Sequence, residues 1–472
     1  MFELHHLTAL EQLEWLRRGE ITPTELARHY LDRIARLNDS VGAFTTVTAD
    51  VAIERAAYVE RSVPRTGALW GLPLGDKDLS MRAGVRTTFG SRLFEHFIPE
   101  RSDEIVAVLD AAGAVSLGKT NAPEFGLPSY TESLVAPPAR NPYDLGLGAG
   151  GSSGGAAVAV AAGLLPVAPG SDGGGSIRIP AAATGLVGLK PSRGLVPAGS
   201  GLDTVAGLVT TGPLARTVAD AALLLDAMIA GGQYQWAVRA PVWDGGALLN
   251  AAARGDGRYQ LGVMTTSPWD DAYDIIVCQE ASDALALALT EFDALGHRIE
   301  EFGLEPDPSY APAFRTIWQA SAANIPADGA ELEKLEPLTR WLLERGRALS
   351  ARDLTAALRQ LALFERSIIR QLSRFDAVLT PALAMTPRPI GWYSASDAEL
   401  NFTQQVQYTP WTSFVNVSGL PAITLPVQVT DAGLPMGVQL IGRPGGEHVL
   451  LAIGAQLEER LAWQHRHPPS WG

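Results

Sequence analysis

The chain has 472 residues, of which 46% are hydrophobic, and a formal net charge of −14 at pH 7. This length is ample for a large buried core, and the acidic balance disfavours nucleic acids and anionic membrane surfaces as partners. The single cysteine, Cys278, excludes an internal disulfide. It fits a reducing compartment, and the first residues show no secretory signal pattern, so we expect a cytoplasmic protein.

The predicted secondary structure alternates between helices and strands. Capping boxes at Thr8 and Thr22, with a glutamate three residues after each, predict the starts of two helices. Hydrophobic periodicity predicts further helices and strands; the helices are expected at 103–112, 216–230 and 280–295, and the strands at 114–117, 164–168, 297–302, 423–427 and 436–441. This alternation indicates an α/β fold with helices on both faces of a sheet.

Residues 310–374 differ from the rest, because their pattern is almost wholly helical. The chain contains no repeat, no low-complexity tail and no linker with a clear shift in composition. We therefore expect residues 1–472 to form a single domain, although length alone would suggest about three.

Two clusters of serine and glycine are the most informative part of the chain. They occupy residues 150–155 (GGSSGG) and 172–178 (DGGGSIR), downstream of a lysine in residues 74–78 (LGDKD). Such stretches are usually turns or linkers, but apolar runs bracket these two, so we expect a core to hold them. Glycine lets a ligand approach the main chain, and successive amide groups can converge on an oxyanion. With serine as nucleophile and a buried lysine as base, these are the parts for acyl transfer without histidine.

The chain resembles the amidase signature family from the lysine to residues 416–422 (NVSGLPA). Other matching segments are residues 118–121 (GKTN), 188–194 (GLKPSRG) and 212–216 (GPLAR). The resemblance implies an amidase with a large mixed sheet flanked by helices on both faces. It also implies that Ser176 is the nucleophile, that Ser152, after a cis peptide bond, is the bridging serine, and that Lys77 is the base.

The same resemblance implies an oxyanion hole made of main-chain amides. The expected donors are the N–H groups of Gly173, Gly174, Gly175 and Ser176. The family more often has threonine at the position of Ser171 and a larger residue at that of Gly173. We expect glycine at position 173 to loosen the oxyanion loop or to widen the acyl pocket.

Other residues near the clusters are predicted to support the loops. Asp172 and Arg178 lie on opposite sides of Ser176, and we expect them to form an ion pair that braces the second cluster, with Ser153 supporting the first. The chain has four lysines, so most of its positive charge is arginine. Arginine cannot serve as a neutral base, which gives Lys77 its significance, whereas Lys119 and Lys190 are expected to brace loops.

The substrate pocket is expected to involve the helical segment and residues near the C-terminus. Candidate lining residues, each weighed evenly against ordinary core packing, are Ser129, Tyr130, Phe314, Trp318, Gln319, Tyr408 and Trp411. We expect no metal, since His465 and His467 lack further ligands nearby, and no cofactor. The expected partner is a small amide, and a homodimer is left open.

Three alternatives compete with a free-standing amidase. Residues 151–155 match the G-x-S-x-G elbow of α/β-hydrolases, with Ser153 as nucleophile and His297 or His448 as base, but no strand precedes them. The chain could also be the amidase-like component of a tRNA-dependent amidotransferase, or a binding module without catalysis.

Residues 408–416 resemble the branch that includes 6-aminohexanoate cyclic-dimer hydrolases. Aryl acylamides, aliphatic amides and carbamates stay open as substrates.

Overall fold

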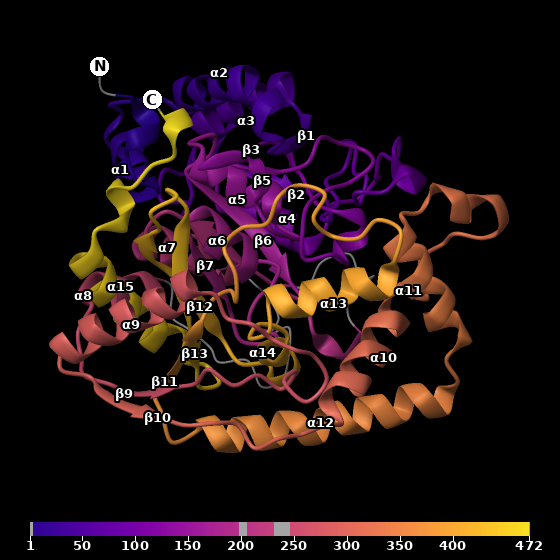
Figure 1. Cartoon of the computed structure of the whole chain (residues 1–472). Coiled ribbons are helices and arrows are strands. Elements are labelled where there is room, and N and C mark those ends of the chain that lie inside the picture. Colours follow the sequence, from indigo (N-terminus) through magenta and orange to yellow (C-terminus); the bar gives the residue numbers. More distant parts are fainter. Residues whose placement is uncertain (1–2, 198–204, 231–245, 472) are drawn as a thin grey trace.

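The computed structural model describes residues 3–197, 205–230 and 246–471. A large sheet lies at its centre, and Figure 1 shows helices on both sides of it. In the order in which they pair, the strands are β10 (Arg298–Glu301), β9 (Gln260–Val263), β11 (Ala377–Pro381), β13 (Pro435–Gly442), β12 (Ala422–Val429), β7 (Val187–Lys190), β8 (Thr210–Ala215) and β6 (Val167–Asp172). The first three are parallel and the others pair antiparallel. The predicted α/β fold with a large mixed sheet is therefore confirmed.

A smaller sheet carries the lysine of the predicted site. It consists of β1 (Phe44–Val47), β3 (Val115–Thr120) and β2 (Pro73–Lys77), with β3 in the middle. The strand β2 packs beside β6, the edge strand of the large sheet. A two-stranded hairpin is formed by β4 (Arg140–Asn141) and β5 (Asp144–Gly148).

Fifteen α-helices lie in the described ranges. They are α1 (Ala9–Arg18), α2 (Pro23–Val41), α3 (Ala49–Ser62), α4 (Glu104–Ala111), α5 (Gly154–Ala161), α6 (Arg178–Thr184), α7 (Val218–Ile229), α8 (Ala247–Arg254), α9 (Gln279–Ala294), α10 (Tyr310–Ala322), α11 (Pro337–Ala348), α12 (Ala351–Leu372), α13 (Ala398–Tyr408), α14 (Ser413–Ser418) and α15 (Glu447–Leu461). Short 3-10 turns occur at η1 (Leu4–His6), η2 (Arg92–Phe94), η3 (Glu124–Gly126), η4 (Val205–Gly207), η5 (Gly329–Lys334), η6 (Trp463–His465) and η7 (Pro469–Trp471). Within these ranges, no helix is both long enough and apolar enough to cross a bilayer.

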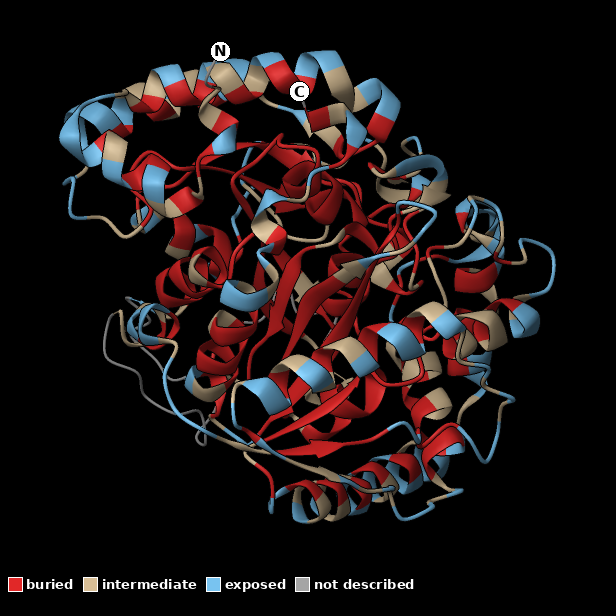
Figure 2. Ribbon diagram, turned by 60° about the vertical axis from the view of Figure 1, so that its left-hand side comes forward, coloured by how far each residue is buried: buried red, intermediate tan, exposed pale blue. Residues whose placement is uncertain are grey.

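The central strands bury side chains on both faces, because successive residues of a strand point to opposite sides. On β11, Ala377 and Leu379 join the core that contains α7, α9 and α15, whereas Val378 joins the core of α10, α12 and α14. Figure 2 shows these strands almost wholly buried, with exposed stripes on the outer helices. The helical prediction for residues 310–374 is confirmed by α10, η5, α11 and α12.

Local signals predicted the helix starts better than the strand ends. Both capping boxes are present, with Thr8 accepting a hydrogen bond from the Glu11 amide and Thr22 from the Glu25 amide. The strand expected at residues 164–168 was misplaced, since β6 runs from Val167 to Asp172. Its polar end is buried through tertiary hydrogen bonds that hydrophobic periodicity does not reveal.

Candidate active site

Lys77 is held at the end of β2 with its amine against two serines. Its Nζ donates to Ser152 Oγ and to Ser171 Oγ, both at 2.9 Å, and to the Ser171 carbonyl at 3.2 Å. The residue is 2% exposed, so water has little access to the amine. The place where β2 meets β6 therefore presents a buried amine to the serine of the first cluster. The serine at position 171 keeps the hydroxyl of the threonine that is more usual there.

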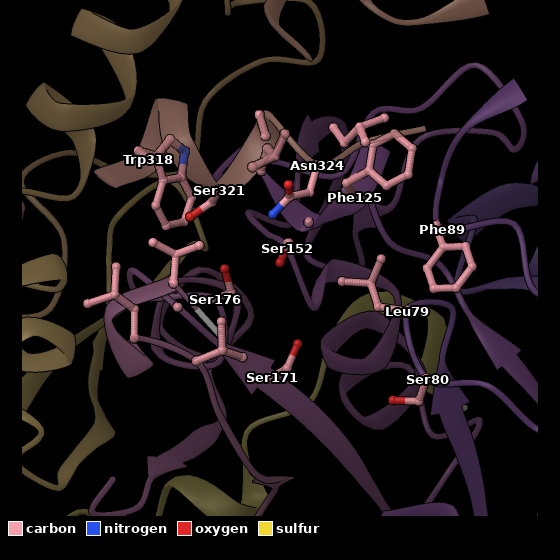
Figure 3. A pocket seen from close by; sticks show the side chains of 18 of the residues that line it. Leu79, Ser80, Phe89, Phe125, Ser152, Ser171, Ser176, Trp318, Ser321 and Asn324 are labelled. Carbon is pink, nitrogen blue, oxygen red and sulfur yellow. The ribbon is translucent and has the colours of Figure 1, made fainter. Parts of the chain in front are cut away.

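Ser152 and Ser176 lie in loops that run into consecutive helices. Ser152 follows a cis peptide bond from Gly151 and is separated from α5 by Ser153, and Ser176 is separated from α6 by Ile177. The Ser153 amide donates to the Ser176 carbonyl at 3.1 Å, which ties the two loops together. Figure 3 shows Ser152 and Ser176 on the wall of one cavity, with Ser171 nearby.

The geometry of Ser153 is that of a loop brace. Its buried hydroxyl donates to the Ser171 carbonyl at 3.2 Å and accepts from the Ser171 amide at 3.3 Å. The Ser153 hydroxyl, just before α5, is therefore turned towards β6. The elbow interpretation requires a strand immediately before the serine, but residues 149–153 form no strand. His297 accepts a hydrogen bond from the Tyr259 amide at 3.1 Å and packs edge-on against Phe292, beside β9 and β10.

The amides of the second cluster do not all point to the same partner. The Gly175 N–H donates to Asp172 Oδ1 at 2.7 Å, and the Ile177 N–H donates to Asp172 Oδ2 at 3.1 Å. An amide has one hydrogen, so Gly175 leaves the predicted set of oxyanion donors. Gly173, Gly174 and Ser176 remain in that set, and Thr412 Oγ1 fixes the loop by donating to the Gly174 carbonyl at 2.6 Å.

Asp172 and Arg178 form a fully buried ion pair below the loop. Arg178 Nη2 lies 2.8 Å from Asp172 Oδ1, and its Nε donates to Oδ2 at 2.9 Å. Asn416 and Gln439 accept from the guanidinium Nη atoms, each at 2.7 Å. Burial disfavours the charged carboxylate, but the Arg178 charge and its hydrogen bonds outweigh burial and hold the pKa of Asp172 well below its ordinary value. Residues from α6, α14 and β13 thus converge on the loop that presents Ser176.

The cavity has two chambers that meet at Ser176. The larger spans about 1030 Å³ and the smaller about 470 Å³, volumes that include the solvent at their open mouths. Ser176, Leu127 and Trp318 line both chambers. Ser152, Ser171 and Gly173 line the larger one, whereas Gly174 lines the smaller one.

Three of the seven predicted lining residues line these chambers. They are Ser129, Phe314 and Trp318. The other four line neither chamber: Tyr130, Tyr408 and Trp411 are buried in core clusters, and the main chain of Gln319 lies against Gly346, where α10 meets α11. Aromatic rings serve a core as well as a pocket, so their type alone could not separate the two roles.

Sequence reasoning missed several residues of the larger chamber. These include Leu79, Phe89, Phe125, Val209, Ser321 and Asn324, most of which Figure 3 labels. Leu79 follows Lys77 by two residues, and Phe125 follows the family-matching residues 118–121 by four, so proximity to a motif was an available signal. Ser321 lies one helical turn after Trp318 and could have been found from that spacing. Val209 and Phe89 carry no such signal.

Gly173 keeps part of the larger chamber open. A Cβ atom at this position would lie 3.0 Å from Val209 Cγ2 and 3.7 Å from the Trp318 ring. A larger residue would therefore fill the space between these two side chains. Of the two effects expected from this glycine, the geometry supports the widening of a pocket.

The two other buried lysines contact main-chain carbonyls. Lys119 Nζ donates to the Ser80 carbonyl, and Lys190 Nζ donates to the Pro191 carbonyl at 2.9 Å. Burial, reinforced by the Arg178 charge, lowers the pKa of Lys190 to about 7. Lys119 thus contacts the segment that follows Lys77.

A group of possible metal ligands lies elsewhere. Glu3, His5 and His29 bring their ligand atoms within 4.8 Å of one another, which sequence spacing did not predict. His5 Nδ1 and His29 Nε2 are 3.2 Å apart, within hydrogen-bonding distance. Burial and the nearby Arg33 charge lower the pKa of His5 to about 3. The same guanidinium disfavours a cation there.

Comparison with known proteins places this geometry in context. A family model described as Amidase matches residues 25–451. The chain is 38% identical to the putative amidase AmiB2 of Mycobacterium tuberculosis, covering 98% of this chain and 97% of that protein. It is 34% identical to a component of the glutamyl-tRNA(Gln) amidotransferase of Roseiflexus sp., covering 98% of each. The solved structure of 6-aminohexanoate cyclic dimer hydrolase complexed with substrate matches with a TM-score of 0.90 and 29% identity, covering 99% of this chain and 100% of that chain.

Proposed function

The chain belongs to the amidase family, and on that premise we propose that it hydrolyses a small carboxamide through Ser176, Ser152 and Lys77. As an amidase it acts on carbon–nitrogen bonds other than peptide bonds. The observation that carries the proposal is the 2.9 Å contact between Lys77 Nζ and Ser152 Oγ, on a cavity that Ser176 also lines. One catalytic domain spanning the chain is supported by the family match.

In the first half-reaction Ser176 Oγ attacks the amide carbon. Its proton passes to Ser152, whose own proton passes to the neutral Lys77 amine. The tetrahedral intermediate then collapses, the C–N bond breaks, and the proton returns through Ser152 to the departing nitrogen. An acyl-enzyme on Ser176 and a free amine result. Histidine has no part in these steps.

Main-chain amides stabilise the negative charge that develops on the carbonyl oxygen. The N–H groups of Gly173, Gly174 and Ser176 are the candidates, and the ion pair of Asp172 and Arg178 fixes the loop that carries them. Losing one such donor typically raises the barrier by about 3–4 kcal/mol. Water then attacks the acyl-enzyme, with the same relay accepting and returning a proton, and a carboxylic acid is released.

The structural relatives suggest which amides are candidate substrates. The likeness to 6-aminohexanoate cyclic dimer hydrolase, with a TM-score of 0.90, supports cyclic or oligomeric amides of 6-aminohexanoate. Aryl acylamides and carbamates are tested alongside them.

A hydrolysis screen with a covalent probe tests this function. Purified wild-type protein should hydrolyse at least one of a set of aliphatic, aryl and cyclic amides, and Ser176→Ala should lose turnover by at least about 10⁴-fold while remaining folded. A fluorophosphonate should label Ser176, as mass spectrometry of the labelled peptide would show. Labelling of Ser153 would instead support the elbow mechanism, and no labelling would support a module without catalysis.

A second candidate is the amidase-like component of a tRNA-dependent amidotransferase. The 34% identity to a component of glutamyl-tRNA(Gln) amidotransferase, over 98% of both chains, favours it. The two candidates differ in what the isolated chain does. Hydrolysis of a simple amide without partner proteins supports the free-standing enzyme, whereas activity that appears only with partner proteins supports the amidotransferase.

A further inference from the structure

The two chambers suggest how the substrate is oriented at Ser176. Because Ser176 lines both, an amide carbon within reach of its hydroxyl places one half of the substrate in each chamber. Trp318 and Leu127 also border both chambers and mark where they join. The cavity thus accommodates groups on both sides of the scissile bond.

The position of Ser152 decides which half lies where. The departing nitrogen must receive its proton from Ser152, and of the two chambers this serine lines the larger. The amine half therefore belongs to the larger chamber and the acyl half to the smaller, where Phe314 and Phe402 form an apolar wall. This assignment rests on the proposed relay.

The side chains that line the two chambers are uncharged in the part of the chain that the structure describes. Among the described residues, neither chamber is lined by an aspartate, glutamate, lysine or arginine side chain. Arg315 packs behind Phe402 and is already paired with Glu399 at 2.5 Å. Glu124, next to the lining residue Phe125, accepts hydrogen bonds from the Ser91 hydroxyl at 2.6 Å and the Glu336 amide at 2.8 Å.

An ion moved into such a cavity loses its hydration and finds no partner of opposite charge. Uncharged groups lose much less and gain from contact with apolar walls. We propose that the substrate is an amide without charge on either side of the C–N bond, with its amine half in the larger chamber and its acyl half in the smaller one. Glutamine, which carries an ammonium and a carboxylate group, is then a poor substrate.

The charge preference is tested with matched amides. Hexanamide, 6-aminohexanamide and the monoamide of adipic acid share a six-carbon acyl chain and differ in the group at its far end. We expect kcat/KM to be at least about 100-fold lower for each charged amide, and L-glutamine to behave like them. Equal values for the neutral and charged amides would overturn the proposal.

The orientation is tested with a matched pair of variants. Ser321 lines the larger chamber and Thr409 the smaller, and each hydroxyl donates at 2.9 Å to the carbonyl four residues earlier in its own helical stretch. Ser321→Leu and Thr409→Leu therefore remove equivalent local bonds and fill one chamber each. Ser321→Leu should lower kcat/KM by about 10-fold for anilides relative to primary amides, and Thr409→Leu should do so for long relative to short acyl groups. The reverse pattern would overturn the orientation.

A binding measurement separates this inference from the proposed function. Calorimetry on folded Ser176→Ala compares the affinity of the three amides without any chemistry. A preference for hexanamide there supports the neutral cavity even if the wild-type protein fails to hydrolyse amides. Tighter binding of a charged amide contradicts the inference even if hydrolysis through Ser176 is established.

Discussion

The serine loops and the helical segment of residues 310–374 border the same cavity but are held in different ways. Around Ser176 the loops are fixed by an ion pair and by side-chain hydrogen bonds from three separate elements. The helical segment is held by apolar packing, with Phe314 in one core cluster and Leu342 in another. Hydrogen bonds fix atoms in particular directions, whereas apolar packing tolerates exchange of side chains of similar volume. The loops therefore suit the chemistry, and the helical wall suits the choice of substrate.

The largest expected effect on activity comes from replacing Lys77, the proposed base of the serine loops. Lys77→Arg should be nearly as damaging as Lys77→Met, because arginine keeps the charge but cannot accept a proton. Single-turnover acylation measures the step concerned, and Lys334→Arg, on the exposed turn η5, is the matched control. If Lys77→Arg kept a tenth of kcat, a barrier increase of only about 1.4 kcal/mol, the lysine would not be the base.

The next effect concerns the ion pair below the loop. Asp172→Asn should lower the free energy of unfolding by about 3–5 kcal/mol, because Arg178 would stay buried without its partner. Urea denaturation measures this, with Glu305→Gln as control, since that carboxylate is 72% exposed in its pair with Arg370. An equal loss in both variants would contradict the special role of the buried pair.

The same ion pair predicts a pH dependence. The pKa of Asp172 is lower in the folded protein than in the unfolded chain, so its contribution is complete above the unfolded value of about 3.9. It declines as the pH falls below that value towards the folded pKa. Asp172→Asn should therefore weaken the acid limb of the stability curve.

A smaller effect should show that the helical segment affects substrate binding without affecting the reactivity of Ser176. A Cβ at Gly346 would lie 2.0 Å from the Gln319 carbonyl, so Gly346→Ala forces α10 and α11 apart and should destabilise the protein by about 1–3 kcal/mol. Because α10 carries Trp318, we expect KM to rise for large substrates while fluorophosphonate labelling of Ser176 proceeds at nearly its normal rate. Gly303→Ala is the control, since its Cβ would make ordinary contacts at 3.9 Å. Equal losses in labelling and substrate use would contradict the separation.

A pH-dependent effect is expected where the helical segment contacts η3, since the Glu336 amide donates to the Glu124 carboxylate. Burial and the Glu124 carboxylate raise the pKa of Glu336, which precedes α11, to about 8. A raised carboxyl pKa means that folding favours the protonated form, so stability falls as the pH rises from the unfolded value of about 4.3. That contribution is lost as the pH passes through about 8.

The glutamine side chain of Glu336→Gln is uncharged at every pH, so this variant should show a weaker fall in stability as the pH rises. Each pKa unit corresponds to about 1.4 kcal/mol, so the variant should be more stable than wild type at pH 9 by about that amount or more. Urea midpoints at pH 5 and pH 9 measure the slope. Glu333→Gln, whose side chain is 75% exposed, should leave it unchanged, and an unchanged slope in Glu336→Gln would contradict the assignment.

The sequence predicted what depends on short-range signals. Thr8 and Thr22 identified helix starts because a capping box lies within four residues. Lys77 and the two serine clusters were found because the chemistry needs particular residue types in small loops. The competition for the Gly175 amide escaped prediction, because it depends on where the Asp172 carboxylate turns in the folded loop.

Features that depend on distant parts of the chain were predicted less well. Trp318 lines the cavity and Trp411 lies in the core, although both are aromatic residues in apolar stretches. The difference arises from the packing of α10 and α14 against other elements. Likewise, β6 ends in the half-buried Ser171 and the buried Asp172, whose placement only the hydrogen bonds of the folded protein explain.

The burial of the lysines has a practical consequence for attaching the protein to a surface. Lys77, Lys119 and Lys190 are at most 2% exposed, so of the four lysines only Lys334 is exposed. Among the lysine side chains, amine-reactive reagents that leave the fold intact should therefore modify Lys334 and spare the three buried ones. Because Lys334 lies on η5, covalent coupling to a resin through this amine would present the molecules in nearly one orientation.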